Sequence, residues 1–144
     1  MVTVQLRSEQ DTALLAARVA QAVRGGLTVG LVGDLGSGKT TFVRHLVKAL
    51  GGDPSQVASP TFTLQHEYRV GGGLAVDHWD LYRLQSAPLE LLEPPDRKVL
   101  RVIEWPDRCP ELQGGIGLLI TLTVSAGEER SAVLAGEGAD QAGA

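Results

Sequence analysis

Eight consecutive residues, 33–40, have the types and the spacing needed to hold a chain of phosphate groups. They read Gly33, Asp34, Leu35, Gly36, Ser37, Gly38, Lys39 and Thr40, which fits the template G-x-x-x-x-G-K-[ST]. Glycines at this spacing let the backbone turn its N–H groups toward phosphate oxygens, and a helix after the loop directs its positive N-terminus at the same charge. The Lys39 ammonium would reach the β- and γ-phosphates. The stretch therefore predicts a site for a nucleoside triphosphate.

The residues on both sides predict the strand and the helix that position such a loop. Residues 27–32 are mostly apolar and predict a buried strand. After Lys39, apolar residues recur at helical spacing as far as Leu50, and Gly51 and Gly52 predict the end of that helix. Strand, loop and helix thus follow one another in the order that the phosphate site requires.

Three acidic residues are candidates for binding the Mg²⁺ ion that phosphate chemistry needs. The usual ligands are the hydroxyl of the loop, here Thr40, and an acid at the end of a neighbouring strand. Asp77 and Asp80 lie at the end of one predicted strand, and Glu104 directly follows the apolar run 99–103. The spacing leaves the choice among the three acids open.

The expected nucleotide is ATP. Many GTPases bind guanine through an Asn/Thr-Lys-x-Asp element, but this chain contains no Asn, and none of its lysines is followed two residues later by Asp. The segment Ser59, Pro60, Thr61 and Phe62 combines a rigid turn with hydroxyl groups, as expected of a loop that orders around a γ-phosphate. An ordinary junction between a loop and a strand also fits these four residues.

The composition predicts one domain over residues 1–134, followed by a disordered tail over 135–144. The 144 residues are 43% apolar and carry a net charge of −4, with a single cysteine that excludes an internal disulfide. The chain has neither a secretion signal nor a long apolar run, so we expect a cytoplasmic protein with no membrane contact. A pI of about 5.3 argues against binding nucleic acid by charge alone, so any contact with RNA is expected to be indirect.

The order of the expected elements predicts an α/β fold of the P-loop NTPase type with three layers. Its mixed sheet is expected to be parallel at the centre and antiparallel where hairpins extend it. The elements expected are a strand over 2–6, a helix from Ser8 to Gly25, strands over 27–32, 62–70, 74–79 and 99–103, a short helix over 88–93, and a hairpin of 116–124 with 131–134.

Four blocks of sequence occur in the order and with the gaps of one known family. They are residues 33–41, 59–64, 78–84 and 103–108, of which the third reads H-W-D-L-Y-R-L and the fourth I-E-W-P-D-R. The first block is shared with many nucleotide-binding proteins, whereas the last two are close to diagnostic. In these blocks the chain resembles the TsaE (YjeE) family, the small bacterial ATPase of tRNA threonylcarbamoyladenosine biosynthesis.

The resemblance implies an enzyme that slowly hydrolyses ATP to ADP with Mg²⁺. It also implies two partners, the other bacterial proteins of the pathway that transfer a threonylcarbamoyl group to adenosine 37 of tRNA. Glu104 falls on the family's magnesium ligand, together with Thr40, and Asp80 falls beside the phosphates, which favours both acids over Asp77. Which of Asp80 and Glu104 orients the attacking water stays open.

The resemblance also implies a role for each residue of the site. The catalytic residues would be Lys39, Asp80 and Glu104; the nucleotide would be bound by residues 33–41 (Thr41 included), Asp80, Trp105 and Arg130; residues 59–62 would form a switch that faces a partner. Two features depart from the family. Glu129 precedes Arg130 where a glycine is usual, which leaves the role of Arg130 open, and residues 89–95 lack the usual glycine.

Two other functions fit a phosphate-binding loop. The chain could be a small-molecule kinase of the P-loop class, which would pass phosphate to a metabolite. It could also be an assembly factor that senses a nucleotide and depends on binding rather than on hydrolysis. Transfer of label from ATP to an acceptor distinguishes the kinase from the ATPase.

Overall fold

One mixed β-sheet organises the part of the chain that the computed structural model describes, residues 1–57 and 64–143. Its strands within these residues are β1 (Val2–Leu6), β2 (Thr28–Val32), β3 (Gln65–Arg69), β4 (Ala75–Asp80), β5 (Val99–Glu104), β6 (Leu118–Val124) and β7 (Arg130–Gly136), in the spatial order β1-β7-β6-β2-β5-β4-β3. The neighbours β6, β2, β5 and β4 are parallel, and β7, β1 and β3 are added antiparallel at the two ends. The expected sheet, parallel at its centre and antiparallel at its extensions, is confirmed.

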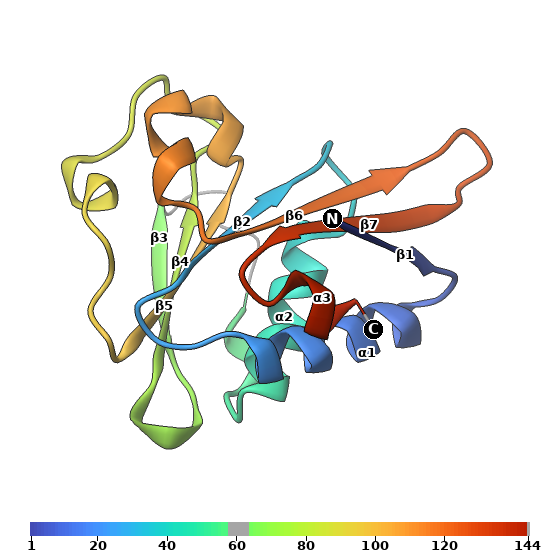
Figure 1. Ribbon diagram of the computed structural model, residues 1–144, viewed down its shortest axis with the longest axis horizontal. Coiled ribbons are helices and arrows are strands. Elements are labelled where there is room, and N and C mark those ends of the chain that lie inside the picture. The colour runs from blue at the N-terminus through green and yellow to red at the C-terminus, as the bar shows by residue number, and fades with distance from the viewer. Residues whose placement is uncertain (58–63, 144) are drawn as a thin grey trace.

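Helices cover one face of the sheet, and short 3₁₀ turns cover the other. Figure 1 shows α1 (Glu9–Ala22), α2 (Lys39–Ala49) and α3 (Ala139–Ala142) on the same side. The opposite face is covered by η3 (Leu89–Leu92), η4 (Pro106–Arg108) and η5 (Pro110–Gly115), while η1 (Pro54–Gln56) and η2 (Gly71–Gly73) lie in connections. The three-layer fold therefore has one layer made of 3₁₀ turns. Within the described residues, no helix combines the length and the apolar character needed to cross a bilayer.

Capping residues set the ends of the two long helices. Ser8 caps α1, because its hydroxyl accepts a hydrogen bond from Asp11 N at 3.2 Å. At the C-terminal end of α2, Gly51 adopts a φ of 93° and donates its N–H to Lys48 O. Gly52 N donates to Val47 O at 2.9 Å. This paired arrangement satisfies carbonyls that the helix leaves open, and a left-handed residue at its centre favours glycine.

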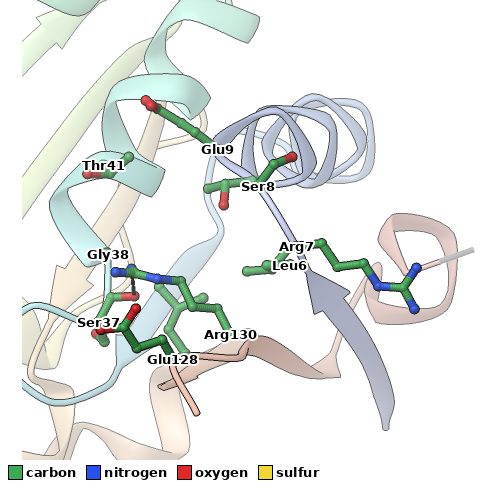
Figure 2. Close-up of a pocket in the computed structure, with 11 residues that line it drawn as sticks. Leu6, Arg7, Ser8, Glu9, Ser37, Gly38, Thr41, Glu128 and Arg130 are labelled. Carbon is green, nitrogen blue, oxygen red and sulfur yellow. Dashed lines mark hydrogen bonds between the residues drawn. The ribbon is translucent and has the colours of Figure 1, made fainter. Parts of the chain in front are cut away.

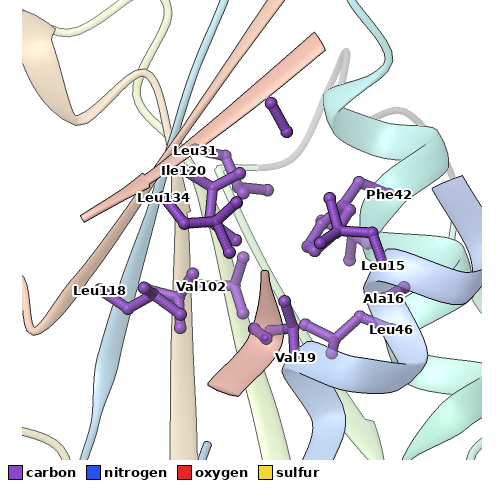
Figure 3. Close-up of a cluster of buried hydrophobic side chains, with 14 of the residues drawn as sticks. Leu15, Ala16, Val19, Leu31, Phe42, Leu46, Val102, Leu118, Ile120 and Leu134 are labelled. Carbon is purple, nitrogen blue, oxygen red and sulfur yellow. The ribbon is translucent and has the colours of Figure 1, made fainter. Parts of the chain in front are cut away.

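The main hydrophobic core lies between the helices and the sheet. Figure 3 shows Leu15, Ala16 and Val19 of α1 with Phe42 and Leu46 of α2, all directed at the sheet. The strands contribute Leu31, Val102, Leu118, Ile120 and Leu134 to this core. A second cluster fills the space under the 3₁₀ turns and contains Trp79, Leu81, Leu91, Ile103, Cys109 and Leu112. Burial on both faces explains why the central strands are almost continuously apolar.

Residues 135–143 form the end of a strand and a short helix, where the sequence predicted a disordered tail over 135–144. Strand β7 continues to Gly136, which lies opposite Leu118 in β6, and α3 follows. Ala142 is fully buried, and Ala139 is 4% exposed. Small side chains allow this helix to pack closely on α1, since a methyl group at Gly138 would lie 3.0 Å from the Cβ atom of Ala22. This packing could not be predicted from the sequence, because residues 135–143 consist mostly of Gly, Ala and acidic residues.

The pleat of β4 and β5 places their acidic residues on opposite faces of the sheet. Asp77 lies beside Arg101 in the parallel register, on the face of the second cluster. Its carboxylate accepts hydrogen bonds from Gln65 Nε2 and from Trp79 Nε1, the latter at 2.8 Å, and lies 3.5 Å from Arg101 Nε. Asp77, one of the three acids that the spacing left open, is thus held in a buried ion pair on the face opposite α2.

Replacing Asp77 with Asn is expected to lower the free energy of unfolding by about 3 kcal/mol, because the buried Arg101 loses its charged partner. Urea denaturation followed by circular dichroism measures this loss. The matched control is Glu67→Gln, an exposed carboxylate directly opposite Asp77 in β3, for which the change should stay within about 0.5 kcal/mol. Equal stability of the two variants would contradict a structural role for Asp77.

Candidate nucleotide-binding site

The loop between β2 and α2 has a backbone conformation that requires glycine at several positions. Gly36 and Gly38 adopt φ angles of 79° and 103°, which residues with a Cβ atom reach only at a cost. A methyl group at Gly33 would lie 2.4 Å from Ser37 Oγ. That hydroxyl oxygen is buried and has no hydrogen-bond partner among the described residues. A buried polar atom of this kind is expected where a ligand supplies the missing partner.

Lys39 begins α2 and turns its ammonium back across the loop. Its Nζ atom donates hydrogen bonds to Gly33 O at 2.6 Å and to Asp34 O at 2.9 Å, and it lies 4.3 Å from the centre of the Trp105 ring. Burial lowers the pKa of Lys39, and nearby carboxylates, first among them Glu104, act in the opposite direction. The ammonium thus lies against the first two residues of the loop, where it would contact an anion bound by the loop.

Thr40 lies beside Glu104, and Asp80 is the neighbour of Glu104 in the sheet. The Thr40 hydroxyl lies 3.4 Å from each carboxylate oxygen of Glu104, the last residue of β5 and only 3% exposed. Asp80 ends β4 beside Glu104 in the parallel register, and its Oδ1 atom accepts a hydrogen bond from Tyr82 N at 2.9 Å. Burial raises the pKa of Asp80, and the charge of Glu104 adds to that effect.

The oxygen atoms gathered here fit a magnesium ion. A hydroxyl and carboxylates are the hard ligands that Mg²⁺ prefers, and they lie beside a loop shaped for phosphate. No group of three or more His, Cys, Asp or Glu side chains that could hold a metal alone occurs in the described ranges. Such a small set of protein ligands is typical of Mg²⁺, which usually keeps several waters and shares phosphate oxygens.

Trp105 covers one side of the loop in a conformation that is unusual for an aromatic residue. Its φ and ψ are 61° and 46°, in the left-handed region, and its N–H is tied to Leu31 O at 3.1 Å. Its ring lies 4.9 Å from that of Tyr82, and the Arg108 guanidinium lies within 5.1 Å of both ring centres. These contacts stabilise the backbone turn that lays the indole beside Lys39.

A cavity of about 390 Å³ opens beside the loop. Figure 2 shows Ser37, Gly38 and Thr41 on one wall and residues 6–9 on another. Arg130 extends over the loop, and its Nη1 atom donates to Ser37 O at 3.4 Å. The volume falls within the range usual for small-molecule sites, so the cavity is large enough for part of a nucleotide.

The structure brings most of the sequence-predicted site residues together. Around the loop lie Gly33, Asp34, Leu35, Gly36, Ser37, Gly38, Lys39, Thr40, Thr41, Asp80, Glu104, Trp105 and Arg130. Ser59, Pro60, Thr61 and Phe62 lie outside the described residues. The roles predicted for all of these residues remain predictions.

Two buried residues for which the sequence predicted no role, His78 and Tyr68, connect to the site through Glu104. His78 Nε2 donates a hydrogen bond to Glu104 Oε2 at 2.6 Å, and the Tyr68 hydroxyl lies 3.2 Å from the other ring nitrogen of His78. His78 lies two residues before Asp80, so the period-2 pleat already indicated that both side chains share a face. The start of α1 was missed as a wall of the cavity, because only the fold brings β1 beside the β6–β7 hairpin.

Comparison with known proteins identifies the family. Its sequence model, described as "Threonylcarbamoyl adenosine biosynthesis protein TsaE", matches residues 6–132. A protein from Aquifex aeolicus is 51% identical over 82 residues, which cover 56% of this chain and 61% of that protein. One from Rickettsia conorii is 39% identical over 104 residues, covering 69% and 58%. Both are named tRNA threonylcarbamoyladenosine biosynthesis protein TsaE, and the chain spans about three-fifths of their length.

A solved structure has the same fold. The chain superposes on YdiB of Bacillus subtilus with a TM-score of 0.66 and 24% identity, covering 92% of this chain and 84% of that one. The sequence match extends from the end of β1 into β7, so it includes the loop, both strand-end acids and Arg130. The chain therefore belongs to the TsaE family.

Proposed function

We propose that this chain is a magnesium-dependent ATPase in the biosynthesis of tRNA threonylcarbamoyladenosine. It binds and hydrolyses ATP in support of the two partner proteins that attach the threonylcarbamoyl group to adenosine 37, and it has only indirect contact with tRNA. The observation that carries the proposal is that Lys39, Thr40 and Glu104 lie close together beside a glycine-rich loop. The names of the curated relatives support the choice of pathway.

The loop binds the phosphates through its backbone and through Lys39. The N-terminus of α2 and the N–H groups of residues 33–38 favour negative charge. Lys39 exchanges its hydrogen bonds to the carbonyls of Gly33 and Asp34 for bonds to phosphate oxygens. Burial lowers the pKa of Lys39, and the carboxylates around it, first among them Glu104, oppose that effect.

Thr40 and Glu104 hold the magnesium ion, which supplies positive charge to the β- and γ-phosphates when it is bound. Asp80 is then the acid that orients the attacking water. Glu104 is already engaged by Thr40 and His78, whereas Asp80 accepts only the Tyr82 N–H among the hydrogen bonds of the described residues. Its raised pKa suits a group that accepts a proton as the water attacks.

Replacing Lys39 with Ala is expected to weaken ATP binding about tenfold to a hundredfold, because a hydrogen bond to a charged group is worth about 1.5–3 kcal/mol. Isothermal titration calorimetry with ATP and Mg²⁺ measures the affinity. Lys48→Ala, at the exposed far end of the same helix, is the matched control and should bind ATP like the unmodified chain. Equal affinities of the two variants would show that the loop does not bind the phosphates.

Incubation with γ-labelled ATP is expected to release free phosphate slowly, and faster when the two partner proteins are added. We expect a rise of about tenfold or more, because a partner that completes a phosphate site supplies positioning and charge. Label on a small-molecule acceptor would instead identify a kinase. Tight ATP binding with no phosphate release, with or without the partners, would identify a nucleotide sensor.

Replacing Asp80 with Asn is expected to slow hydrolysis about a hundredfold and to stabilise the fold at neutral pH. Because the pKa of Asp80 is raised on folding, chiefly by burial, its ionised form costs folding free energy above that pKa. The cost disappears as the pH falls below the ordinary range of an aspartic acid, where the carboxyl is protonated in both states. Thermal unfolding from pH 7 down to pH 3 should therefore show the gain shrinking to zero.

The exposed Asp107, near the same site, provides the control for this experiment. Asp107→Asn should hydrolyse ATP at nearly the unmodified rate. A stability gain in Asp80→Asn that persists unchanged at pH 3 would refute the assigned direction of the pKa shift.

A further inference from the structure

A buried row of hydrogen bonds leads from the edge of the sheet to the candidate metal ligand. The Tyr68 hydroxyl lies 3.2 Å from His78 Nδ1, and His78 Nε2 lies 2.6 Å from Glu104 Oε2. The three residues belong to the adjacent strands β3, β4 and β5 and are 1–3% exposed. Both ring nitrogens of His78 are therefore engaged, and neither faces water.

The direction of the hydrogen bonds follows from what each group can donate. A carboxylate only accepts, so His78 Nε2 donates to Glu104, and in the neutral ring His78 Nδ1 accepts from the Tyr68 hydroxyl. Burial, with the charge of Glu104 added, raises the pKa of Tyr68, which keeps its phenol protonated and able to donate. The row thus fixes one tautomer and one ring orientation of His78.

The hydrogen bond from His78 also restricts the Glu104 carboxylate. With Oε2 held at 2.6 Å, the group cannot rotate freely, and both of its oxygens lie 3.4 Å from Thr40 Oγ1. A hydrogen bond that involves a charged group is both short and strong, so it can hold this orientation in a buried site. An apolar residue at position 78 would fill the same space without orienting the acid.

We propose that His78 is a positioning residue that holds the Glu104 carboxylate facing Thr40 so that both can bind the metal ion of the nucleotide site. Tyr68 acts one step further away by fixing the imidazole. The inference rests on the proposed function, since it takes Glu104 as the metal ligand. His78 and Tyr68 would thus act through Glu104, without contacting the phosphates themselves.

The test compares His78→Leu with His78→Gln, whose side-chain amide retains an N–H donor. The affinity for a non-hydrolysable ATP analogue is measured by calorimetry, once with Mn²⁺ and once with EDTA, and bound Mn²⁺ is counted by electron paramagnetic resonance. Loss of an outer partner of a metal ligand usually costs about 10–100-fold in metal affinity, so His78→Leu should lose that much of the gain from Mn²⁺. Its affinity in EDTA should be unchanged, and His78→Gln should recover most of the gain.

Val102→Ala is the matched control, because Val102 is fully buried in β5 directly beside His78 in the register. It weakens the fold through a cavity but leaves Glu104 untouched. An equal loss of Mn²⁺ affinity in Val102→Ala and His78→Leu would overturn the positioning role. If His78→Leu does not fold, Tyr68→Phe carries the same comparison, with a smaller loss expected and no loss overturning the proposal. An unmodified chain that gains nothing from Mn²⁺ would overturn the proposed function as well, which separates the two failures.

Discussion

The parallel register of β2, β5 and β4 is the constraint on which the site depends. Glu104 lies opposite Leu31 on one side and Asp80 on the other, and the candidate loop over residues 33–40 leaves the sheet one residue after Leu31, at Val32. Because the carboxyl ends of these strands meet at the same edge, the loop and both acids are delivered to one place. A shift of one residue in β5 would turn Glu104 to the opposite face, away from Thr40.

Two polar networks on opposite faces support this register. On one face Asp77 is paired with Arg101, and on the other His78 bonds to Glu104. Each network joins β4 to β5. Asp77 and His78 are consecutive residues of β4, so the pleat directs their side chains to opposite faces of the sheet. Buried polar groups are costly unless they are paired, so these contacts favour the register that brings Asp77 to Arg101 and His78 to Glu104.

The charges of the candidate site are consistent with the proposed ligand, an anion accompanied by a cation. Burial lowers the pKa of Lys39 and raises that of Asp80, so each charged form is held at some cost. Phosphates would compensate Lys39 and the loop N–H groups, and a divalent ion would compensate the two acids. The Lys39 ammonium also lies 4.3 Å from the centre of the Trp105 ring.

The glycine-rich loop over residues 33–40, the strand and helix around it, and nearly all the elements of the sheet could be predicted from the sequence, because they follow from local spacing, capping residues and apolar periodicity. It also supplied the four blocks that carried the family resemblance. Four features could not be predicted in this way: the ion pair of Asp77 with Arg101, the contact of His78 with Glu104, the cavity wall formed by the start of α1, and the packing of residues 139–142 as a helix. These features depend on which strands become neighbours and in which register. Contacts between residues distant along the chain set that order, and no local pattern encodes it.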